Sequence, residues 1–334
     1  MPNETLSVIW QPRDDVRKWP REFDWICTLL PEQPTRHIRD GAYEVVRGPA
    51  IVIVDGYDLN SGQLRTYFRQ FRASDRPFLV VHVGDEHATA PLDFYDEAPV
   101  VYRNYWRVDA AQEANCRFLP LGPNGSSDLL QQHAQTHRTW RWSFAGQSRP
   151  ARWPLIRAAQ TRNDGRLVVN RAFNSGLDKE AYARLLGQSD VVLCPRGWSS
   201  VECYRVYEAL EAGALPLVED DGGMGLMDEH LHWGAAGRML RAGPRYWIDV
   251  ARRARRPSYW QRVFGLEMPL PRIYRWENLD DALARIRPGQ RERAVHWWHR
   301  YKQRLRRQIA DDIAKHLAPS TEQRHTPTPN RSRS

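Results

Sequence analysis

The residues best suited to chemistry lie between positions 189 and 221, in the segment SDVVLCPRGWSSVECYRVYEALEAGALPLVEDD. Arg196 stands in a Pro-Arg-Gly turn, where a guanidinium can hold a phosphate by paired hydrogen bonds. Ser199 and Ser200 follow at the expected start of a helix, whose unpaired N–H groups and positive dipole end also favour anions. The segment therefore predicts a site for a phosphorylated ligand.

Two further charged residues of this segment lie deeper in the expected helix. Arg205 and Glu208 are three residues apart, so they are neighbours on one helix face. Arg205 would add to the positive charge around a phosphate, and Glu208 can accept hydrogen bonds from a hydroxylated ligand. The alternative is that Glu202, Arg205 and Glu208 only form ion pairs on the helix surface.

A strand, a helix and a second strand must position these residues. The apolar run 190–194 predicts a strand that ends at the Pro-Arg-Gly turn. Ser199 and Glu202 have the spacing of a helix cap, which predicts a helix over 200–212. A following glycine would end this helix, and 214–218 predicts the next parallel strand.

The first half of the chain repeats this alternation of buried strands and helices, which predicts a doubly wound parallel sheet. Its clearest strands are 51–54 and 78–83. In such a sheet, ligands bind beyond the carboxyl ends of the strands. Polar residues expected at these strand ends are candidates for contact with a second substrate: Asp55, Asp58, Asp85, Glu86, His87 and Arg103. The alternative for each of them is a purely structural role in a turn or a helix cap.

Glu86 is our choice among these for a general base. Asp85 directly follows Gly84, and its short side chain suits the N–H groups of the turn itself, but it remains the alternative. A carboxyl group in a partly desolvated cleft has its pKa raised toward the useful range. His82 and His87 could suggest a metal site, but their spacing matches no zinc pattern, so we expect no metal there.

The second half opens with a strand over 139–144 and a turn at Gly146, followed by two arginines near the next helix start. Arg152 is expected to be a second phosphate ligand, with Arg149 as the close alternative. The chain is thus divided into an N-terminal domain (1–137), a C-terminal domain (138–285), a basic helix (286–317) and a disordered tail (318–334).

The segment CPRG followed by RVYEALEAGALPLV resembles the donor-binding signature of the exostosin-type glycosyltransferases. The resemblance implies the GT-B architecture of two facing Rossmann-like domains, with a nucleotide-sugar bound mainly by the second. It implies that Arg196 and Ser199 or Ser200 face the diphosphate, and that Glu208 binds the ribose. The family pattern FxG…R places Arg152 against the same diphosphate.

This resemblance implies transfer of a sugar, expected to come from a UDP-sugar, onto a hydroxyl of a glycan, glycolipid or glycoprotein, with inversion. Arginines and a helix dipole would stabilise the departing diphosphate, so no metal and no cofactor besides the donor are expected. No DxD motif and no phosphate-loop ending GK[ST] occurs. A GT-B epimerase or phosphorylase is a rival, distinguished by whether nucleotide release requires a free acceptor.

The charge of the chain suggests one alternative to an enzyme, which is a binding protein. The 334 residues carry a formal net charge of +9, and much of the excess lies in 252–256 and 285–307. A nucleic-acid or anionic-surface binding protein on an inactive sugar-nucleotide fold would use this region. We instead expect no nucleic-acid partner, and predict that helix 291–317 docks across the two domains. The alternative is peripheral contact with anionic lipid.

The remaining composition indicates where the chain works. The four cysteines show no paired spacing, which fits a reduced compartment. The first residues lack a basic segment before an apolar run, and no apolar stretch of spanning length occurs. We therefore expect a cytoplasmic protein, with the inner membrane face as a peripheral alternative, similar to soluble bacterial family members that build surface polysaccharides.

Overall fold

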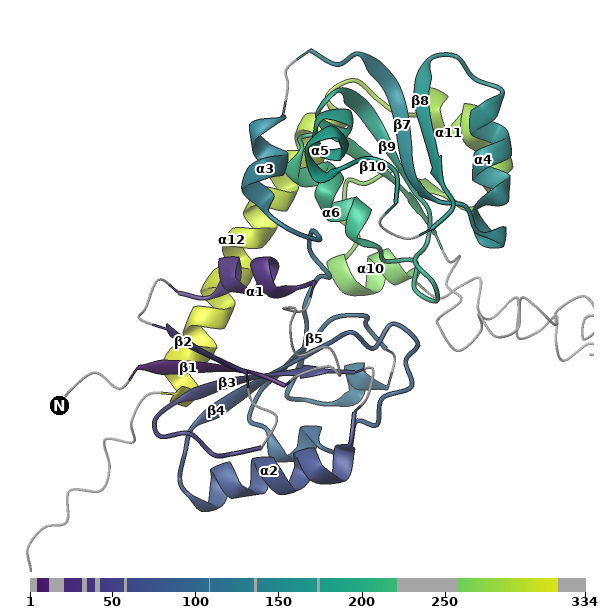
Figure 1. Cartoon of the computed structure of the whole chain (residues 1–334). Helices are drawn as coiled ribbons and strands as arrows, with labels where there is room; N and C mark the ends of the chain where they lie inside the picture. The colour runs from purple at the N-terminus through teal and green to yellow at the C-terminus, as the bar shows by residue number, and fades with distance from the viewer. Residues whose placement is uncertain are drawn as a thin grey trace, which may run out of the picture.

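The structure is a computed structural model that describes residues 5–11, 21–31, 35–39, 43–56, 59–107, 109–134, 137–172, 175–220 and 257–317 (Figure 1). Asp58, the basic run 252–256 and the predicted tail lie outside these residues. No helix in the described ranges is long and apolar enough to cross a membrane.

A six-stranded parallel sheet forms the first domain, with strand order β2-β1-β3-β4-β5-β6. Helix α2 covers one face, where its apolar side chains pack on alternate strand residues, and helices α1 and α12 cover the other. The elements are β1 (Leu6–Trp10), α1 (Phe23–Leu29), β2 (Thr35–Arg39), β3 (Ala50–Asp55), α2 (Ser61–Ala73), β4 (Phe78–Val83), η1 (Tyr95–Glu97), β5 (Val101–Arg103), η2 (Ala110–Gln112) and β6 (Cys116–Phe118).

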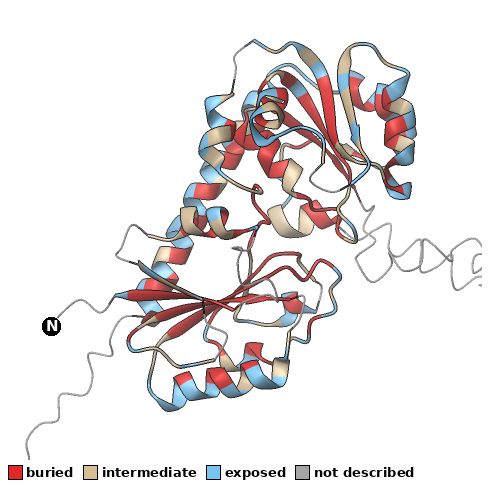
Figure 2. Cartoon of the chain, in the orientation of Figure 1, coloured by how far each residue is buried: buried red, intermediate tan, exposed pale blue. Residues whose placement is uncertain are grey.

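A five-stranded parallel sheet forms the second domain, with order β11-β10-β9-β7-β8. Figure 2 shows buried strands in both sheets and helices exposed on their outer sides. The elements are α3 (Ser127–Gln132), β7 (Trp140–Gln147), η3 (Pro150–Arg152), α4 (Trp153–Gln160), β8 (Gly165–Asn170), α5 (Lys179–Gly187), β9 (Ser189–Cys194), α6 (Tyr204–Glu211), β10 (Leu215–Glu219), α10 (Tyr259–Phe264), β11 (Arg272–Ile273), η5 (Trp276–Asn278), α11 (Leu279–Ala284) and α12 (Gln290–Leu317). The predicted class, two Rossmann-like parallel-sheet domains with a C-terminal helix, is confirmed.

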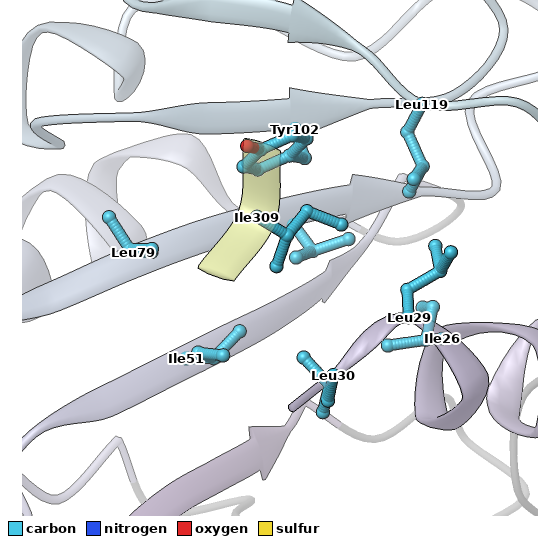
Figure 3. Close-up of a pocket in the computed structure, with 9 residues that line it drawn as sticks. Ile26, Leu29, Leu30, Ile51, Leu79, Tyr102, Leu119 and Ile309 are labelled. Atoms are coloured by element: carbon cyan, nitrogen blue, oxygen red, sulfur yellow. The ribbon is translucent and has the colours of Figure 1, made fainter. Parts of the chain in front are cut away.

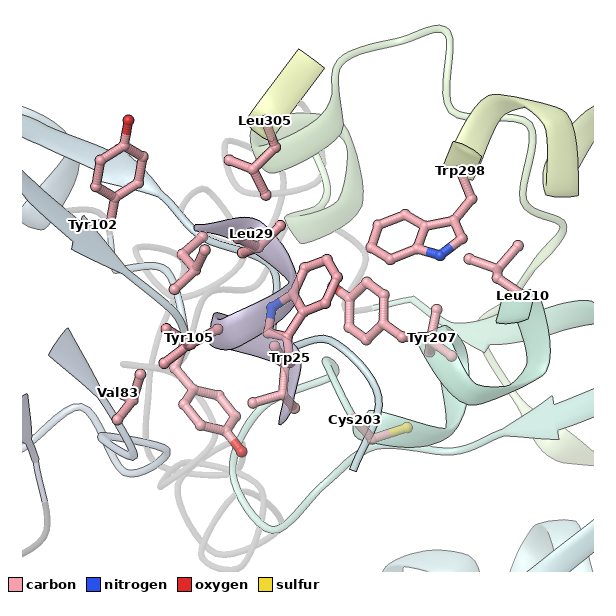
Figure 4. Close-up of a cluster of buried hydrophobic side chains, with 14 of the residues drawn as sticks. Trp25, Leu29, Val83, Tyr102, Tyr105, Cys203, Tyr207, Leu210, Trp298 and Leu305 are labelled. Atoms are coloured by element: carbon pink, nitrogen blue, oxygen red, sulfur yellow. The ribbon is translucent and has the colours of Figure 1, made fainter. Parts of the chain in front are cut away.

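Helix α12 joins the two domains. Near its start, Trp298 Nε1 donates to Glu211 at 2.8 Å, and Lys302 Nζ lies 2.6 Å from the same carboxylate. Near its end, Asp312 accepts hydrogen bonds from Tyr102 and Arg117 of the first sheet. The apolar side chains between them belong to a core cluster that spans both domains (Figure 4). The docked-helix prediction is thus confirmed, since the apolar face lies inside the protein.

The start of α6 differs from the prediction. The helix begins at Tyr204 after the N-cap residue Cys203, rather than at Ser200. Glu202 does not reach back to Ser199, because its buried carboxylate accepts hydrogen bonds from the N–H of Leu121 and from two tyrosine hydroxyls. The turn between β9 and α6 is therefore longer than predicted and is held by contacts from distant parts of the chain.

Other boundaries were displaced or missed. The strand expected over 139–144 extends to Gln147. Helix α1 and strands β2 and β11 were not predicted. A seven-residue helix and a two-residue strand are too short to show the periodicity of their side chains, which is 3.6 residues in a helix and two in a strand.

A small apolar cavity lies between α12 and the first sheet, and it makes Ile309 a sensitive position. The cavity has a volume of about 20 Å³, and Ile309 lines it opposite Leu79 and Tyr102 (Figure 3). We expect Ile309→Ala to lower the free energy of unfolding by about 2–5 kcal/mol, because the new void adds to one that is already there.

Urea unfolding of Ile309→Ala and of the matched variant Ile309→Val would check this, since the valine should cost only about 0.5–1.5 kcal/mol. Equal losses for the two variants would contradict the packing argument.

Candidate active site

The Pro-Arg-Gly turn lies at the carboxyl end of β9, as the sequence indicates. Gly197 N–H donates to the carbonyl of Ser200 at 2.7 Å, and Ser200 Oγ accepts the N–H of Glu202 at 3.1 Å. Ser200 is buried, so its hydroxyl serves the turn. Burial raises the pKa of Glu202, which receives both tyrosine hydroxyls noted above. The turn is therefore a rigid support for the residues around it.

Three arginines converge beside this turn. Arg149 Nη2 donates to the carbonyls of Arg196 and Gly197 at 3.2 and 2.7 Å, and Arg152 Nη2 donates to the Arg196 carbonyl at 3.1 Å. Arg205 donates to the carbonyl of Ala145 at 2.9 Å. The predicted phosphate ligands Arg149, Arg152 and Arg205 are thus brought together.

Gly146, near the carboxyl end of β7, makes room for these arginines. A Cβ atom at Gly146 would come within 2.6 Å of Arg205 Nη2 and 3.5 Å of Arg152 Nη1. Any side chain at this position would therefore push the guanidinium groups apart.

The cluster carries uncompensated positive charge. In the part of the chain that the structure describes, no carboxylate forms an ion pair with Arg149, Arg152 or Arg205. Burial, followed by the charges of Arg205 and Arg149, lowers the pKa of Arg152 to about 9. Burial likewise lowers the pKa of Arg149. The pKa of Arg205 is instead raised, because nearby groups including Glu208 favour its charge against the effect of burial. The charges of Arg149 and Arg152 are thus held at a cost, which a bound anion would offset.

Arg196 is held differently. Its Nε lies 2.5 Å from Glu219 Oε1 at the end of β10, and its backbone N–H donates to the same carboxylate at 3.2 Å. Trp276 Nε1 also donates to Glu219, which fixes that side chain. The sequence did not identify Glu219 as the partner of Arg196, because the position of an acidic residue at a strand end does not show which turn it contacts.

Glu86 reaches this turn from the opposite domain. Its Oε1 accepts the backbone N–H groups of Trp198 and of Ser199, the latter at 3.3 Å. A Cβ atom at Gly197 would collide with that oxygen. The neighbouring His87 Nδ1 and Ser199 Oγ are 2.7 Å apart. The loop after β4 and the turn after β9 therefore meet across the domain boundary.

Asp85 is turned away from this meeting point. Its Oδ2 lies 2.5 Å from Arg103 Nη2 and 3.3 Å from Arg107 Nη1, and its Oδ1 accepts the N–H groups of Thr89 and Ala90. Arg103, proposed from the sequence as a contact for the acceptor, is fully buried, and its guanidinium is engaged by Asp85, His82 and Tyr95.

His82 is not placed to share a metal ion with His87. Its buried Nδ1 lies 2.8 Å from Tyr95 Oη and 2.9 Å from Arg103 Nη1. Burial lowers its pKa well below the usual value. The metal alternative for His82 and His87 is therefore not supported, because their ring nitrogens face different partners.

Glu208 is buried beneath the linker between the domains. One carboxylate oxygen accepts the Tyr182 hydroxyl at 2.6 Å, and the other accepts the Asn124 N–H at 3.3 Å. Burial raises its pKa, so the alternative of a surface ion pair with Arg205 is wrong for this residue. Asp55 lies at the end of β3 and is also buried.

One residue of the site was missed in the sequence. Trp198 is 63% exposed at the turn, and the Arg149 guanidinium lies 4.4 Å from the centroid of its ring. The tryptophan in the Pro-Arg-Gly-Trp turn was visible in the sequence, but single exposed aromatic residues are common on protein surfaces, so it gave no clear signal.

The second domain is the part that resembles known proteins. Residues 161–246 match the family model described as RXYLT1 C-terminal domain. Ribitol-5-phosphate xylosyltransferase 1 of Danio rerio is 56% identical over 39 residues, which are 12% of this chain and 9% of the relative. The Homo sapiens protein of the same name is 42% identical over 64 residues, 18% of this chain and 14% of the relative.

The chain thus spans less than a sixth of the length of these curated relatives. The match to the family model covers β9, the arginine-bearing turn and α6. It names a different group from the exostosin family of the sequence-based prediction, which therefore stays a prediction. Over this segment, the chain is similar to glycosyltransferases.

Proposed function

We propose that the protein is a glycosyltransferase that moves a sugar from a nucleotide-sugar to a hydroxyl group. One observation carries the proposal: Glu86 of the first domain reaches the turn of the second domain beside which Arg149, Arg152 and Arg205 converge. A carboxylate across from an excess of positive charge is the pair of groups that displacement of a diphosphate requires. The similarity of the second domain to xylosyltransferases supports the same conclusion.

The arginines are proposed to bind the diphosphate of the donor and to stabilise its charge as it departs. Arg152 and Arg205 would act directly, and Arg196 would do so from its ion pair with Glu219. Glu208 would accept a ribose hydroxyl in exchange for one of its present partners. The names of the relatives make a UDP-pentose the first donor to test, and a polyol phosphate the first acceptor.

Glu86 is proposed to take the proton of the acceptor hydroxyl. In this structure, its Oε1 accepts hydrogen bonds from the N–H groups of Trp198 and Ser199. These are the N–H groups that would bind the diphosphate of the donor. The diphosphate would replace the carboxylate there and release it toward the acceptor. The proposed reaction is direct displacement, in which the arginines would take the role of a metal ion. Inversion is expected from the resemblance to the exostosin-type enzymes.

We expect UDP to raise Tm, because a ligand bound by the folded state alone stabilises it by about 2.7 kcal/mol at 100 times its Kd. EDTA should not abolish the shift. Arg152→Met should reduce the shift without lowering the Tm of the free protein, since it removes one of three mutually repelling charges.

Arg157→Met is the matched control, because Arg157 lies exposed on the neighbouring helix α4. Thermal shift measurements with UDP, GDP and UDP-sugars would check all of these. The proposal fails if no nucleoside diphosphate shifts the Tm of the wild-type protein, or if the two arginine variants respond alike.

A further inference from the structure

A buried amide beside the proposed base has no partner. The side chain of Asn104 is on a residue only 1% exposed, and neither Oδ1 nor Nδ2 forms a hydrogen bond with any residue in the described ranges. The backbone N–H of Asn104 donates to the His82 carbonyl at 3.2 Å, which anchors the residue beside β4. Buried polar groups are nearly always hydrogen-bonded, so this amide indicates a ligand contact.

The amide lies at the edge of the sheet where ligands bind. Asn104 directly follows β5, and Glu86 follows the adjacent parallel strand β4, so the two loops leave the same edge. Gln11, which directly follows β1 at this edge, is a second buried side-chain amide without a hydrogen-bond partner in the described ranges. It is 6% exposed, and its Oε1 and Nε2 likewise have no partner among the described residues.

The next residue, Tyr105, shows a strained backbone. Its φ is 48°, in the left-handed region that a bulky side chain rarely adopts. Such strain collects at functional sites, where surrounding structure holds the residue in place. Figure 4 shows its hydroxyl directed out of the apolar cluster that contains Trp25 and Trp298. The hydroxyl feels the charges of three carboxylates, Glu86, Glu22 and Glu202.

These charges decide what the amide can bind. The negative charges of Glu86, Glu22 and Glu202 act on Tyr105 and disfavour an anion beside it. An amide offers two donors and an acceptor, and each sugar hydroxyl both donates and accepts. A neutral ligand rich in hydroxyl groups can pair with the donors and the acceptor of the amide and avoids repulsion by the nearby carboxylates.

We infer that Asn104 and Tyr105 form a binding subsite for neutral hydroxyl groups, with Gln11 as a further contact at the same edge. Asn104 holds a ligand hydroxyl between its amide oxygen and nitrogen, and Tyr105 binds a neighbouring one. If the proposed function holds, this is the subsite that presents the acceptor hydroxyl to Glu86.

The test replaces the amide by an apolar side chain of similar shape. Asn104→Leu should raise Tm by about 2–4 °C, because an unpaired polar group is removed from the interior. Asn115→Leu is the matched control and should lower Tm, since Asn115 Nδ2 donates to the carbonyls of Tyr95 and Ala98 at 2.8 and 2.7 Å.

Binding is measured on the full chain by saturation-transfer NMR with sorbitol and D-glucose as probes. We expect signals with the wild-type protein and with Asn115→Leu, loss with Asn104→Leu and weakening with Tyr105→Phe, which keeps the ring. Tyr105→Phe also keeps the inference testable should Asn104→Leu fail to fold.

Three results would overturn the inference. One is a higher Tm of Asn104→Leu with undiminished probe signals, which would mean that an internal water alone meets the amide. Another is a fall in Tm like that of Asn115→Leu, and the third is the absence of probe signals with the wild-type protein. Because no nucleotide is present, a chain that binds the probes but no nucleoside diphosphate would refute the proposed function and retain the subsite.

Discussion

Glu86→Gln should slow sugar transfer by about 10²- to 10⁴-fold at saturating donor and acceptor, the usual contribution of a general base. The glutamine amide oxygen can still accept the N–H groups of Trp198 and Ser199, so the contact between the domains is kept. The substitution removes the negative charge that competes with a diphosphate for these groups. Binding of UDP should therefore be as tight as in the wild-type protein, or tighter.

The neighbouring carboxylate provides the control. Asp85→Asn should lower the free energy of unfolding by about 3–5 kcal/mol, because it leaves Arg103 charged and buried without its partner. Steady-state kinetics and urea unfolding of both variants would thus separate a chemical role from a structural one.

The assignment of Glu86 fails if its variant turns over within about tenfold of the wild-type rate. His87, which already contacts Ser199, would then be the next candidate for the base.

The strands were predictable because local pattern and burial agree in them. The run Phe78–Val83 is apolar except for His82 and is buried at every position, and the structure gives the same bounds. The clustering of the arginines was partly predictable for a related reason. Parallel strands bring their carboxyl ends to one edge, so residues after β7 and β9 had to meet.

The helix start at Tyr204 could not be predicted, because distant residues decide it. The local spacing of Ser199 and Glu202 favours a cap, but Tyr259 and Leu121 bind the glutamate from 57 and 81 residues away. Two buried tyrosine hydroxyls and a backbone N–H outweigh one cap, which is worth only about 1 kcal/mol.

The roles of the first-domain residues were hidden for the same reason. Arg103, Asp85 and His82 are each plausible at a strand end, and the sequence cannot tell which of them bind one another. The unpaired amide of Asn104 could not be predicted from the sequence at all. Only a structure shows that this side chain is buried and has no hydrogen-bond partner among the described residues.

Removal of helix α12 should abolish folding. Six large apolar side chains of this helix are buried, namely Trp297, Trp298, Leu305, Ile309, Ile313 and Leu317. At about 1.5–3 kcal/mol each, their burial contributes roughly 9–18 kcal/mol, as much as the whole stability of a domain. A chain that stops at Arg285 should therefore aggregate or lack cooperative unfolding by circular dichroism, whereas one that stops at Leu317 should match the full-length protein.

A point variant tests the same helix without removing it. Lys302→Met leaves the carboxylate of Glu211 buried with Trp298 and Gln131 as its partners among the described residues, and should cost about 3–5 kcal/mol. Adding Glu211→Gln should restore part of that loss, because the unpaired charge is gone while the amide oxygen can still accept the hydrogen bond from Trp298. If the double variant were no more stable than Lys302→Met, or if the chain ending at Arg285 unfolded cooperatively at the wild-type Tm, α12 would be an appendage rather than part of the core.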